Sequence, residues 1–366
     1  MNNQLTTERE KNISRTIEAT TGASSEKDAD NAKPQMMKTI RIHKYGGPEV
    51  MHYEEAPRPR AKSDEVLIRV IAAGVNPADW KIREGYTKDF FIHKFPLILG
   101  WDSSGVVEEV GSGVSRFKKG DEVYSVSDFS RDGTYAKYVA VRESAIAFKP
   151  KSLHHVHAAA VPVAALTAWQ ALFDAAQLKT GQCVLVHAAS GGVGHFAVQL
   201  AKWKGTHVIG TASKDNHGML YQLGVDQAID YTTQRFEDVA RDVDVVIDPI
   251  AGETQERSWK VLKRDGILVS LHQDASDKAT KALGLTGGIV PLHQEKAKAL
   301  GLRGAYVAVK PNGAQLAKIA AVIDSGNLKP VVSRVLPLSE ARRALNLSQS
   351  SHIRGKMVLR VNGPTL

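Results

Sequence analysis

The chain has very little cysteine. Cys183 is its single cysteine among 366 residues. One thiol cannot form an intramolecular disulfide, and it cannot build a metal site that needs two or more thiolates. A lack of disulfides is typical of proteins in reducing compartments, so we expect a cytoplasmic location.

Long hydrophobic runs are also missing. The most apolar stretch extends from about His157 to Ala176, but Pro162, Gln170 and Asp174 interrupt it. A membrane-spanning helix would expose these residues to lipid, so we predict no membrane association. The composition, 43% hydrophobic and 24% charged, is ordinary for globular proteins, and 366 residues predict two domains.

Blocks of like charge do not occur. The net charge is +9, but the lysines and arginines are dispersed along the chain. Dispersed charge is typical of a solvated surface, and no known nucleic-acid-binding motif is present. We therefore do not expect a nucleic-acid partner, although RNA binding stays open as an alternative because the chain is basic.

Residues 1–36 contain almost no large apolar side chains. Such a segment cannot offset the entropy of ordering, and we predict a disordered extension. A transit peptide is the alternative, but acidic residues such as Glu8, Glu10 and Glu18 disfavour it. Met36 or Met37 is a candidate natural start.

The pattern of apolar residues changes twice along the rest of the chain. Residues 37–155 contain short β-branched runs such as EVLIRVIAAGV, which predict a β-rich domain. Residues 156–308 alternate between strand and helix patterns, which predicts an α/β fold with a doubly wound parallel sheet of the Rossmann type. Residues 309–366 end in a strand-like segment, GKMVLRVNG, that we expect to rejoin the first domain.

A glycine turn stands between the first predicted strand and helix of the Rossmann segment. Gly191, Gly192 and Gly194 follow the apolar strand 183–187 and precede an apolar helical pattern. Glycine allows the backbone to approach a diphosphate, whose charge the start of the helix stabilises. The spacing departs from G-x-G-x-x-G, but the placement predicts a dinucleotide site.

The end of the second strand distinguishes NAD from NADP. NAD enzymes usually place a carboxylate there to bind the ribose 2′-hydroxyl. This chain has Ser213 and Lys214, a hydroxyl donor and a positive charge, which favour the 2′-phosphate of NADP. Asp215 follows directly and leaves NAD as an alternative.

Several segments together resemble a known family. They include GQCVLVHAASGGVGHFAVQLAK, AAGVNPADWKIREG, AAAVPVAALTAWQAL and the ending RGKMVLRV. In this order the segments resemble the zinc-free quinone oxidoreductases, or zeta-crystallin-like members, of the medium-chain dehydrogenase/reductase superfamily, over about residues 37–362. The resemblance implies a Rossmann domain inserted in a GroES-like β-rich domain, NADP as the cofactor, and a homodimer.

The resemblance also implies a set of site residues. Asn76 and Lys81 would be the catalytic hydrogen-bond donors, and Trp101 and Asp102 would shape the wall of the cleft without acting in catalysis. The cofactor-binding set implied by the family is Asn76, Thr167, Ser190, Gly191, Gly192, Val193, Gly194, Ser213, Lys214, Tyr231, Ser270, Leu271, Arg354 and Lys356.

Zinc ligands are missing at the positions where zinc-dependent relatives carry them. Asn76 stands in the place of a cysteine, and Gly100-Trp101-Asp102 stands in the place of a GHE motif. We therefore expect no metal and predict hydride transfer to a quinone or an α,β-unsaturated carbonyl compound, with a protein donor stabilising the oxyanion. The alternatives are a coenzyme-sensing or RNA-binding protein and a zinc-type alcohol dehydrogenase.

Structural roles compete with the proposed catalytic ones. Asn76 precedes Pro77 and can simply hold a turn, and Asp79 can cap the following helix. Lys81 can be a solvated surface lysine. The sequence does not decide between these roles and a catalytic site.

Overall fold

The computed structural model describes residues 35–88, 92–272, 288–350 and 353–362. The predicted disordered extension, residues 1–36, lies outside this range except for its last two residues, and strand β1 (Met36–Ile42) begins at the second of them. Within the described ranges, no helix has the length and apolar character needed to cross a membrane.

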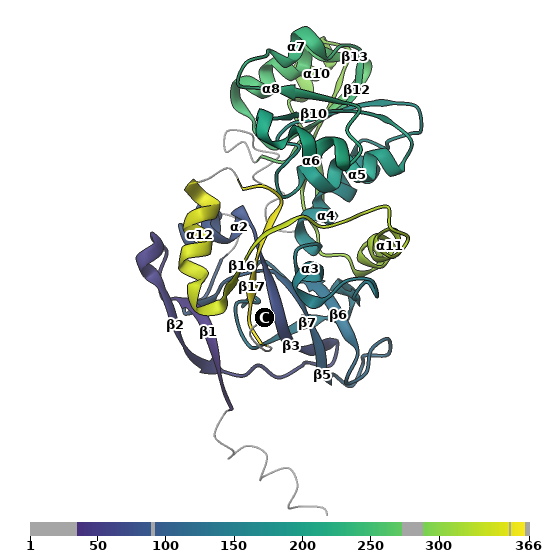
Figure 1. Ribbon diagram of the computed structural model, residues 1–366. Helices are drawn as coiled ribbons and strands as arrows, with labels where there is room; N and C mark the ends of the chain where they lie inside the picture. The colour runs from purple at the N-terminus through teal and green to yellow at the C-terminus, as the bar shows by residue number, and fades with distance from the viewer. Residues whose placement is uncertain (1–34, 89–91, 273–287, 351–352, 363–366) are drawn as a thin grey trace, which may run out of the picture. The chain divides into compact units, whose positions relative to one another are not determined.

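The second half of the chain forms a seven-stranded sheet of the Rossmann type (Figure 1). All neighbouring strands are parallel except the last pair, and the order reverses next to the first strand. This order confirms the predicted doubly wound sheet. In spatial order the strands are β11 (Gln227–Asp230), β10 (His207–Ala212), β9 (Cys183–Val186), β12 (Val243–Asp248), β13 (Leu262–Ser270), β15 (Arg303–Ala308) and β14 (Gly288–Pro291).

Short helices connect these strands. The glycine turn leads from β9 into a ten-residue helix, α5, whose apolar residues face the sheet. The helices between the strands of this sheet are α5 (Gly194–Trp203), α6 (His217–Gln222), α7 (Phe236–Val239), α8 (Gly252–Ser258) and α10 (Gln294–Ala299). Before the sheet come α3 (His155–Ala159), which packs on β3 (Glu65–Val75) and β5 (Asp102–Val110) of the β-rich part, and α4 (Pro162–Trp169), and after it comes α11 (Gly313–Asp324).

The β-rich part is built from both ends of the chain. Its larger sheet has the order β16 (Val332–Pro337), β17 (Lys356–Arg360), β3 (Glu65–Val75), β5 (Asp102–Val110), β6 (Glu122–Val126) and β8 (Ile146–Phe148), with β7 (Tyr138–Arg142) also paired to β3. A smaller sheet joins β2 (Met51–Pro57), β1 and β4 (Leu97–Ile98), and the helices are α2 (Pro77–Arg83) and α12 (Ala341–Ser350). The limits at 155/156 and 308/309 stay predictions.

The closing strand β17 pairs antiparallel with β3. Met357 lies opposite Val75, and Leu359 lies opposite Ala73. This pairing confirms the predicted return of the C-terminal segment to the first part of the chain. It also brings Lys356 beside the end of β3, where the chain continues into Asn76 and α2.

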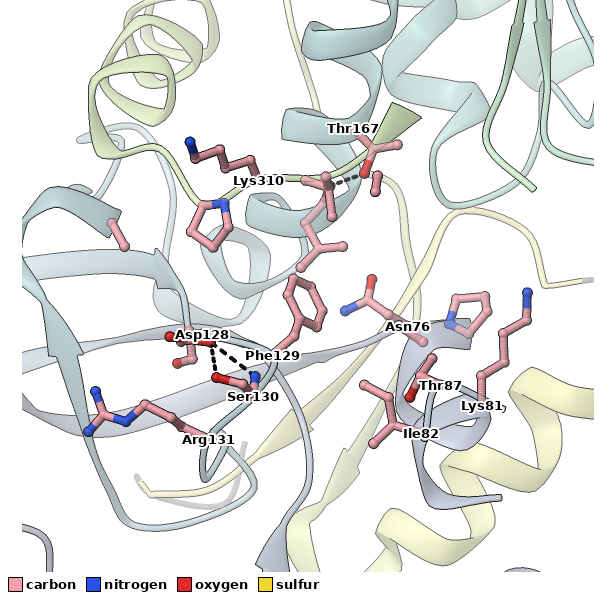
Figure 2. Close-up of a pocket in the computed structure, with 18 of the residues that line it drawn as sticks. Asn76, Lys81, Ile82, Thr87, Asp128, Phe129, Ser130, Arg131, Thr167 and Lys310 are labelled. Carbon is pink, nitrogen blue, oxygen red and sulfur yellow. Dashed lines mark hydrogen bonds between the residues drawn. The ribbon is translucent and has the colours of Figure 1, made fainter. Parts of the chain in front are cut away.

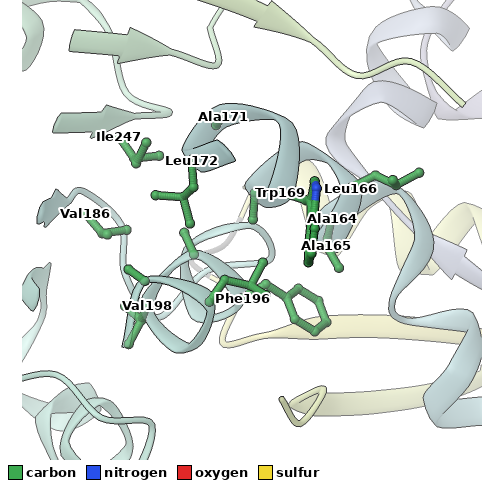
Figure 3. Close-up of a cluster of buried hydrophobic side chains, with 14 of the residues drawn as sticks. Ala164, Ala165, Leu166, Trp169, Ala171, Leu172, Val186, Phe196, Val198 and Ile247 are labelled. Atoms are coloured by element: carbon green, nitrogen blue, oxygen red, sulfur yellow. The ribbon is translucent and has the colours of Figure 1, made fainter. Parts of the chain in front are cut away.

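The largest hydrophobic core surrounds α4 (Figure 3). Every residue of α4 is buried, because the helix packs on α5 and is covered on all sides. This complete burial explains why the segment has the most apolar sequence in the chain without spanning a membrane. Phe196 of α5 lies in this cluster with Leu166 and Trp169 of α4.

The start of α2 is fixed by a capping box. Asp79 accepts a hydrogen bond from the backbone N of Asn76 at 2.7 Å, and Pro77 occupies the first turn. Tyr135 donates its hydroxyl to the same carboxyl oxygen at 2.6 Å. Burial raises the pKa of Asp79 to about 7, because these hydrogen bonds offset only part of the desolvation. The expected capping role of Asp79 is therefore confirmed.

We predict that Phe196→Ala lowers the free energy of unfolding by about 3 to 5 kcal/mol, because a fully buried ring is removed and the core collapses only partly. Urea denaturation measures the change. Leu300→Ala, at an exposed position, is the control and should change stability by less than about 0.5 kcal/mol. Equal losses in the two variants would contradict the assigned core.

We also predict that Asp79 makes folding stability depend on pH. Its pKa is raised in the folded state, so between pH 3.8 and about 7 the folded chain retains a proton that the unfolded chain releases. The contribution of Asp79 therefore falls as pH rises through this window, by at most about 1.4 kcal/mol per pH unit. Asp79→Asn, which resembles the protonated form, should flatten the pH profile measured by urea denaturation. An unchanged slope in the variant would refute this assignment.

Candidate active site

The glycine turn lies at the carboxyl end of β9, where the strand order of the sheet reverses. A side chain at Gly194 would come within 2.2 Å of the Ala188 carbonyl oxygen, so this glycine is needed for close packing of the turn. At Gly192 the nearest atom would be Cδ of Lys356 at 3.3 Å, which leaves this backbone accessible. No side chain caps α5, although His195 N and Phe196 N donate to Gly191 O and Val193 O. The amides of Gly192, Val193 and Gly194 have no hydrogen bond within the described residues, so they remain available to an anion.

The ends of β10 and β11 place three predicted cofactor residues on one edge of the sheet. Ala212 pairs with Asp230, so Ser213 and Tyr231, which follow them, leave neighbouring strands at the same level. Lys214 is exposed next to Ser213, and half of Tyr231 is exposed at 50%. A hydroxyl, a cation and a phenol thus line the position expected for the second ribose.

A pocket of about 740 Å³ contains several of the predicted residues (Figure 2). Asn76, Lys81, Thr167, Val193 and Leu271 all line it. The residues Asn76, Lys81, Ile82 and Thr87 come from the α2 region, whereas Asp128–Arg131 form a loop across the pocket. The structure therefore brings the two catalytic candidates and one residue of the glycine turn into a single cavity.

Asn76 is held by buried charged groups. It is 4% exposed, and its side-chain nitrogen donates to Asp102 Oδ2 at 2.9 Å. The Lys356 ammonium donates to Asn76 Oδ1. The same ammonium lies 3.5 Å from Asp102 Oδ2. Asn76 therefore both begins α2 and presents an oriented amide at the pocket wall.

The two ionised neighbours of Asn76 are strongly desolvated. Burial lowers the pKa of the Lys356 ammonium, and the Asp102 and Asp79 carboxylates oppose that shift. Burial raises the pKa of Asp102, and Lys356 together with the hydrogen bond from Asn76 opposes it. The opposite charge and the hydrogen bonds of each group therefore offset part of the desolvation of the other.

Lys81 and Thr167 have more access to the pocket. Lys81 is half-buried, and desolvation lowers the pKa of its ammonium. Its Nζ lies 5.7 Å from the centre of the Trp80 ring. The Thr167 hydroxyl donates to Val163 O at 2.7 Å, which leaves its oxygen lone pairs free to accept a hydrogen bond.

The other predicted cofactor residues lie away from the pocket lining. Ser190 O accepts a hydrogen bond from Gly355 N at 2.8 Å, which ties the glycine turn to the C-terminal segment. Arg354 is exposed, and its Nε contacts Met219 Sδ of α6 at 2.9 Å. Ser270 is fully buried, and its hydroxyl is hydrogen-bonded to Gln255 and His272 O. The proposed cofactor contact of Ser270 therefore stays a prediction that its side-chain contacts do not favour.

Part of the site is made by segments that lie far apart in the sequence, and the sequence patterns do not predict these contacts. Asp102 was expected only to shape the wall, but it is a direct hydrogen-bond partner of Asn76. Trp101 does not line the pocket itself but stacks on Phe129, which does, with ring centres 5.5 Å apart. The strand Tyr306–Ala308 and the loop that follows it also line the pocket, and no motif indicates them. No sequence motif indicates the contact between Asp102 and Asn76, because the burial of this carboxylate is not visible in the sequence.

Two family models match the chain in sequence. Residues 62–151 match the alcohol dehydrogenase GroES-like domain, and residues 223–359 match a domain described as zinc-binding dehydrogenase. The second description names a family and not the metal content of this chain.

Curated proteins and solved structures are similar over most of the chain. A mitochondrial NAD(P)H oxidoreductase of Mus musculus is 34% identical, with 90% of this chain and 91% of the relative covered. A chloroplastic NADPH-dependent alkenal/one oxidoreductase of Arabidopsis thaliana is 35% identical, with coverages of 90% and 81%. The solved quinone oxidoreductase of Coxiella burnetii has a TM-score of 0.80 and 36% identity, covering 90% of this chain and 100% of that chain.

These relatives overturn the expected cytoplasmic location. The proteins from Mus musculus and Arabidopsis thaliana are mitochondrial and chloroplastic, and a chloroplastic quinone oxidoreductase homologue of Spinacia oleracea is 32% identical. The prediction was wrong because a single cysteine excludes a disulfide but does not distinguish one compartment from another.

The comparisons confirm the predicted family, the fold and a nicotinamide cofactor of the NAD(P)H type. The glycine turn at the switch point of the sheet and the uncapped start of α5 fit such a cofactor. The chain belongs to the quinone oxidoreductase group of the medium-chain dehydrogenase/reductase superfamily.

Proposed function

We propose that this oxidoreductase uses NADPH to reduce a quinone or an α,β-unsaturated carbonyl compound without zinc. The observation that carries the proposal is the oriented amide of Asn76 in a pocket that Val193 of the glycine turn also lines. The alkenal/one oxidoreductase and the quinone oxidoreductase among the relatives support this choice of acceptor.

The pocket residues suit the charge that develops during reduction. When bound, NADPH supplies the hydride. Hydride addition to an acceptor builds negative charge on its carbonyl oxygen, which a hydrogen-bond donor can stabilise. The Asn76 amide is that donor, the Lys81 ammonium adds positive charge to the same pocket, and the proton comes from solvent or a bound donor.

The preference for NADPH rests on the edge formed by β10 and β11. The backbone amides of Gly192, Val193 and Gly194 would hold the diphosphate. Ser213, Lys214 and Tyr231 would hold the 2′-phosphate, since no carboxylate occupies the end of β10. Thr167 would accept a hydrogen bond from the nicotinamide amide at the pocket wall.

The side chains near the pocket support a reaction that does not use zinc. Over the ranges of the chain that the structure describes, no group of three or more His, Cys, Asp or Glu residues is arranged to hold a metal ion. Both oxygens of Asp102 accept hydrogen bonds, from Asn76 and from Val163 N. Cys183 begins β9 at the end opposite the glycine turn, and burial raises its pKa to about 11, which disfavours the thiolate.

The homodimer implied by the family resemblance stays a prediction. A small-molecule acceptor is the proposed partner of the pocket, and no nucleic-acid partner is proposed.

We predict that the purified chain oxidises NADPH in stopped-flow assays with at least one member of a panel of quinones and enones. Asn76→Ala should lower kcat/KM by roughly 100-fold to 1,000-fold, because a donor to the developing oxyanion is lost. Turnover should persist after treatment with a zinc chelator. If no acceptor oxidises NADPH above background, the proposed function is refuted, and if chelation abolishes turnover, the zinc-independent part is refuted.

We predict that Lys214→Ala raises the Kd for NADPH by roughly 10-fold to 100-fold, because a charged partner of the 2′-phosphate is removed. Calorimetric titration with NADPH and with NADH measures the change. The Kd for NADH should stay constant in this variant. Lys204→Ala, at an exposed position after α5, is the matched control and should bind both coenzymes like the parent chain. Equal weakening of NADPH and NADH by Lys214→Ala would contradict the assignment.

A further inference from the structure

The side-chain amide of Asn76 can adopt two orientations that differ by a rotation of 180°. In one orientation the oxygen faces Lys356 and the nitrogen faces Asp102, as the hydrogen bonds show. In the other, the NH₂ group would meet an ammonium and the carbonyl would meet a carboxylate. Two opposite charges on the two sides of the amide therefore favour one orientation strongly.

The Lys356 ammonium is directed entirely into the protein. Lys356 is 3% exposed, and its Nζ donates to Val75 O at 2.8 Å as well as to Asn76 Oδ1. Its third neighbour is Asp102 Oδ2 at 3.5 Å. These partners account for the three donors of the ammonium. The contact with the cofactor that the family resemblance implies for Lys356 is therefore not available to its charged end in this arrangement.

Asp102 extends the arrangement to the start of α4. It is fully buried, and its second carboxyl oxygen accepts a hydrogen bond from Val163 N at 2.6 Å. Val163 lies in the first turn of α4, which carries Thr167 one turn later. The ion pair between Lys356 and Asp102 thus connects three elements: β17, the start of α2 and the start of α4. The Asn76 amide lies between the two charged groups.

Stability alone does not account for this pair. Burying two charges costs solvation energy that their attraction repays only with good geometry and further hydrogen bonds, and apolar residues of similar volume are often as stable. The pair does supply an amide orientation that apolar residues cannot impose. That orientation leaves one N–H of Asn76 for a ligand in the pocket, since Asp102 uses only one of the two.

We propose that Lys356 and Asp102 are positioning residues that select the orientation of the Asn76 amide, so that its remaining N–H serves the acceptor oxygen. This inference rests on the proposed function, in which Asn76 is the donor. Lys356 acts through Asn76 and does not contact the acceptor or the coenzyme through its ammonium.

A double-mutant cycle tests the proposal. Lys356→Met should lower kcat by about 100-fold, because a displaced donor loses most of its effect on the transition state. The same change in an Asn76→Ala background should have almost no further effect, since the residue being positioned is already absent. The Kd for NADPH, measured by fluorescence titration, should stay close to that of the parent chain. Additive losses of kcat, or a Kd that rises in parallel with the loss of kcat, would overturn the proposal.

A matched variant separates positioning from general destabilisation. Lys149 is another buried lysine, with 6% of its side chain exposed and its Nζ 3.3 Å from Glu122 Oε2, but it lies outside the pocket. Lys149→Met should lower the melting temperature and leave kcat unchanged. Lys356→Arg should restore part of the activity lost in Lys356→Met, because a buried cation is retained. A comparable fall in kcat for Lys149→Met would refute a specific role for Lys356.

If Lys356→Met does not fold, Asp102→Asn provides the second variant. Its amide can still accept from Val163 N, but it removes the carboxylate that faces the Asn76 nitrogen. We expect a lower kcat at an unchanged Kd for NADPH. A kcat equal to that of the parent chain would overturn the proposal.

The orientation of the amide can also be examined without turnover. The side-chain ¹H–¹⁵N signals of Asn76, assigned by their loss in Asn76→Ala, should broaden or double in Asp102→Asn and Lys356→Met, where two orientations become populated, and should stay as one pair in Lys149→Met. A single sharp pair in the first two variants would refute the positioning role even if the enzyme is active. An inactive parent chain with these changes in the variants would refute the proposed function and leave the positioning intact.

Discussion

Antiparallel pairing of β17 with β3 is the contact on which the rest of this molecule depends. It joins residues 356–360 to the end of a strand nearly three hundred positions earlier and so closes the β-rich part around the inserted Rossmann segment. The pairing also brings Gly355 and Lys356 against the glycine turn, where Gly355 N donates to Ser190 O. The segment from Gly355 into β17 thus connects the glycine turn with the pocket wall.

The pocket combines an apolar lining with a few buried polar groups. Phe129, Val163, Val193 and Tyr306 contribute apolar surface, which suits a flat unsaturated acceptor. Asn76 supplies a donor whose direction is set by charges that have no access to solvent. The low polarity around these charges strengthens their effect on the amide, as in other preorganised sites.

Asn76 combines a structural role with the donor role that we propose for it. Its backbone begins α2 through the capping box with Asp79, and its side chain faces the pocket between Lys356 and Asp102. The competing readings of the sequence, a turn residue and a site residue, are therefore compatible. The rigid start of α2 places the amide, and the ion pair orients it.

The sequence by itself determined the strand, glycine turn and helix of the nucleotide-binding unit, because these features depend on neighbours a few residues apart. It also indicated Ser213 at the end of the second strand, whereas Tyr231 was implied by the family resemblance. Parallel pairing of β10 and β11 brings the two positions to one edge of the sheet. The prediction of a cytoplasmic location was wrong, because a single cysteine does not distinguish one reducing compartment from another. Only the tertiary structure decided that Asp102 and Lys356 meet at Asn76. Strand pairing between distant segments brings them within hydrogen-bonding distance of the amide, and burial strengthens the electrostatic interaction of their charges with it.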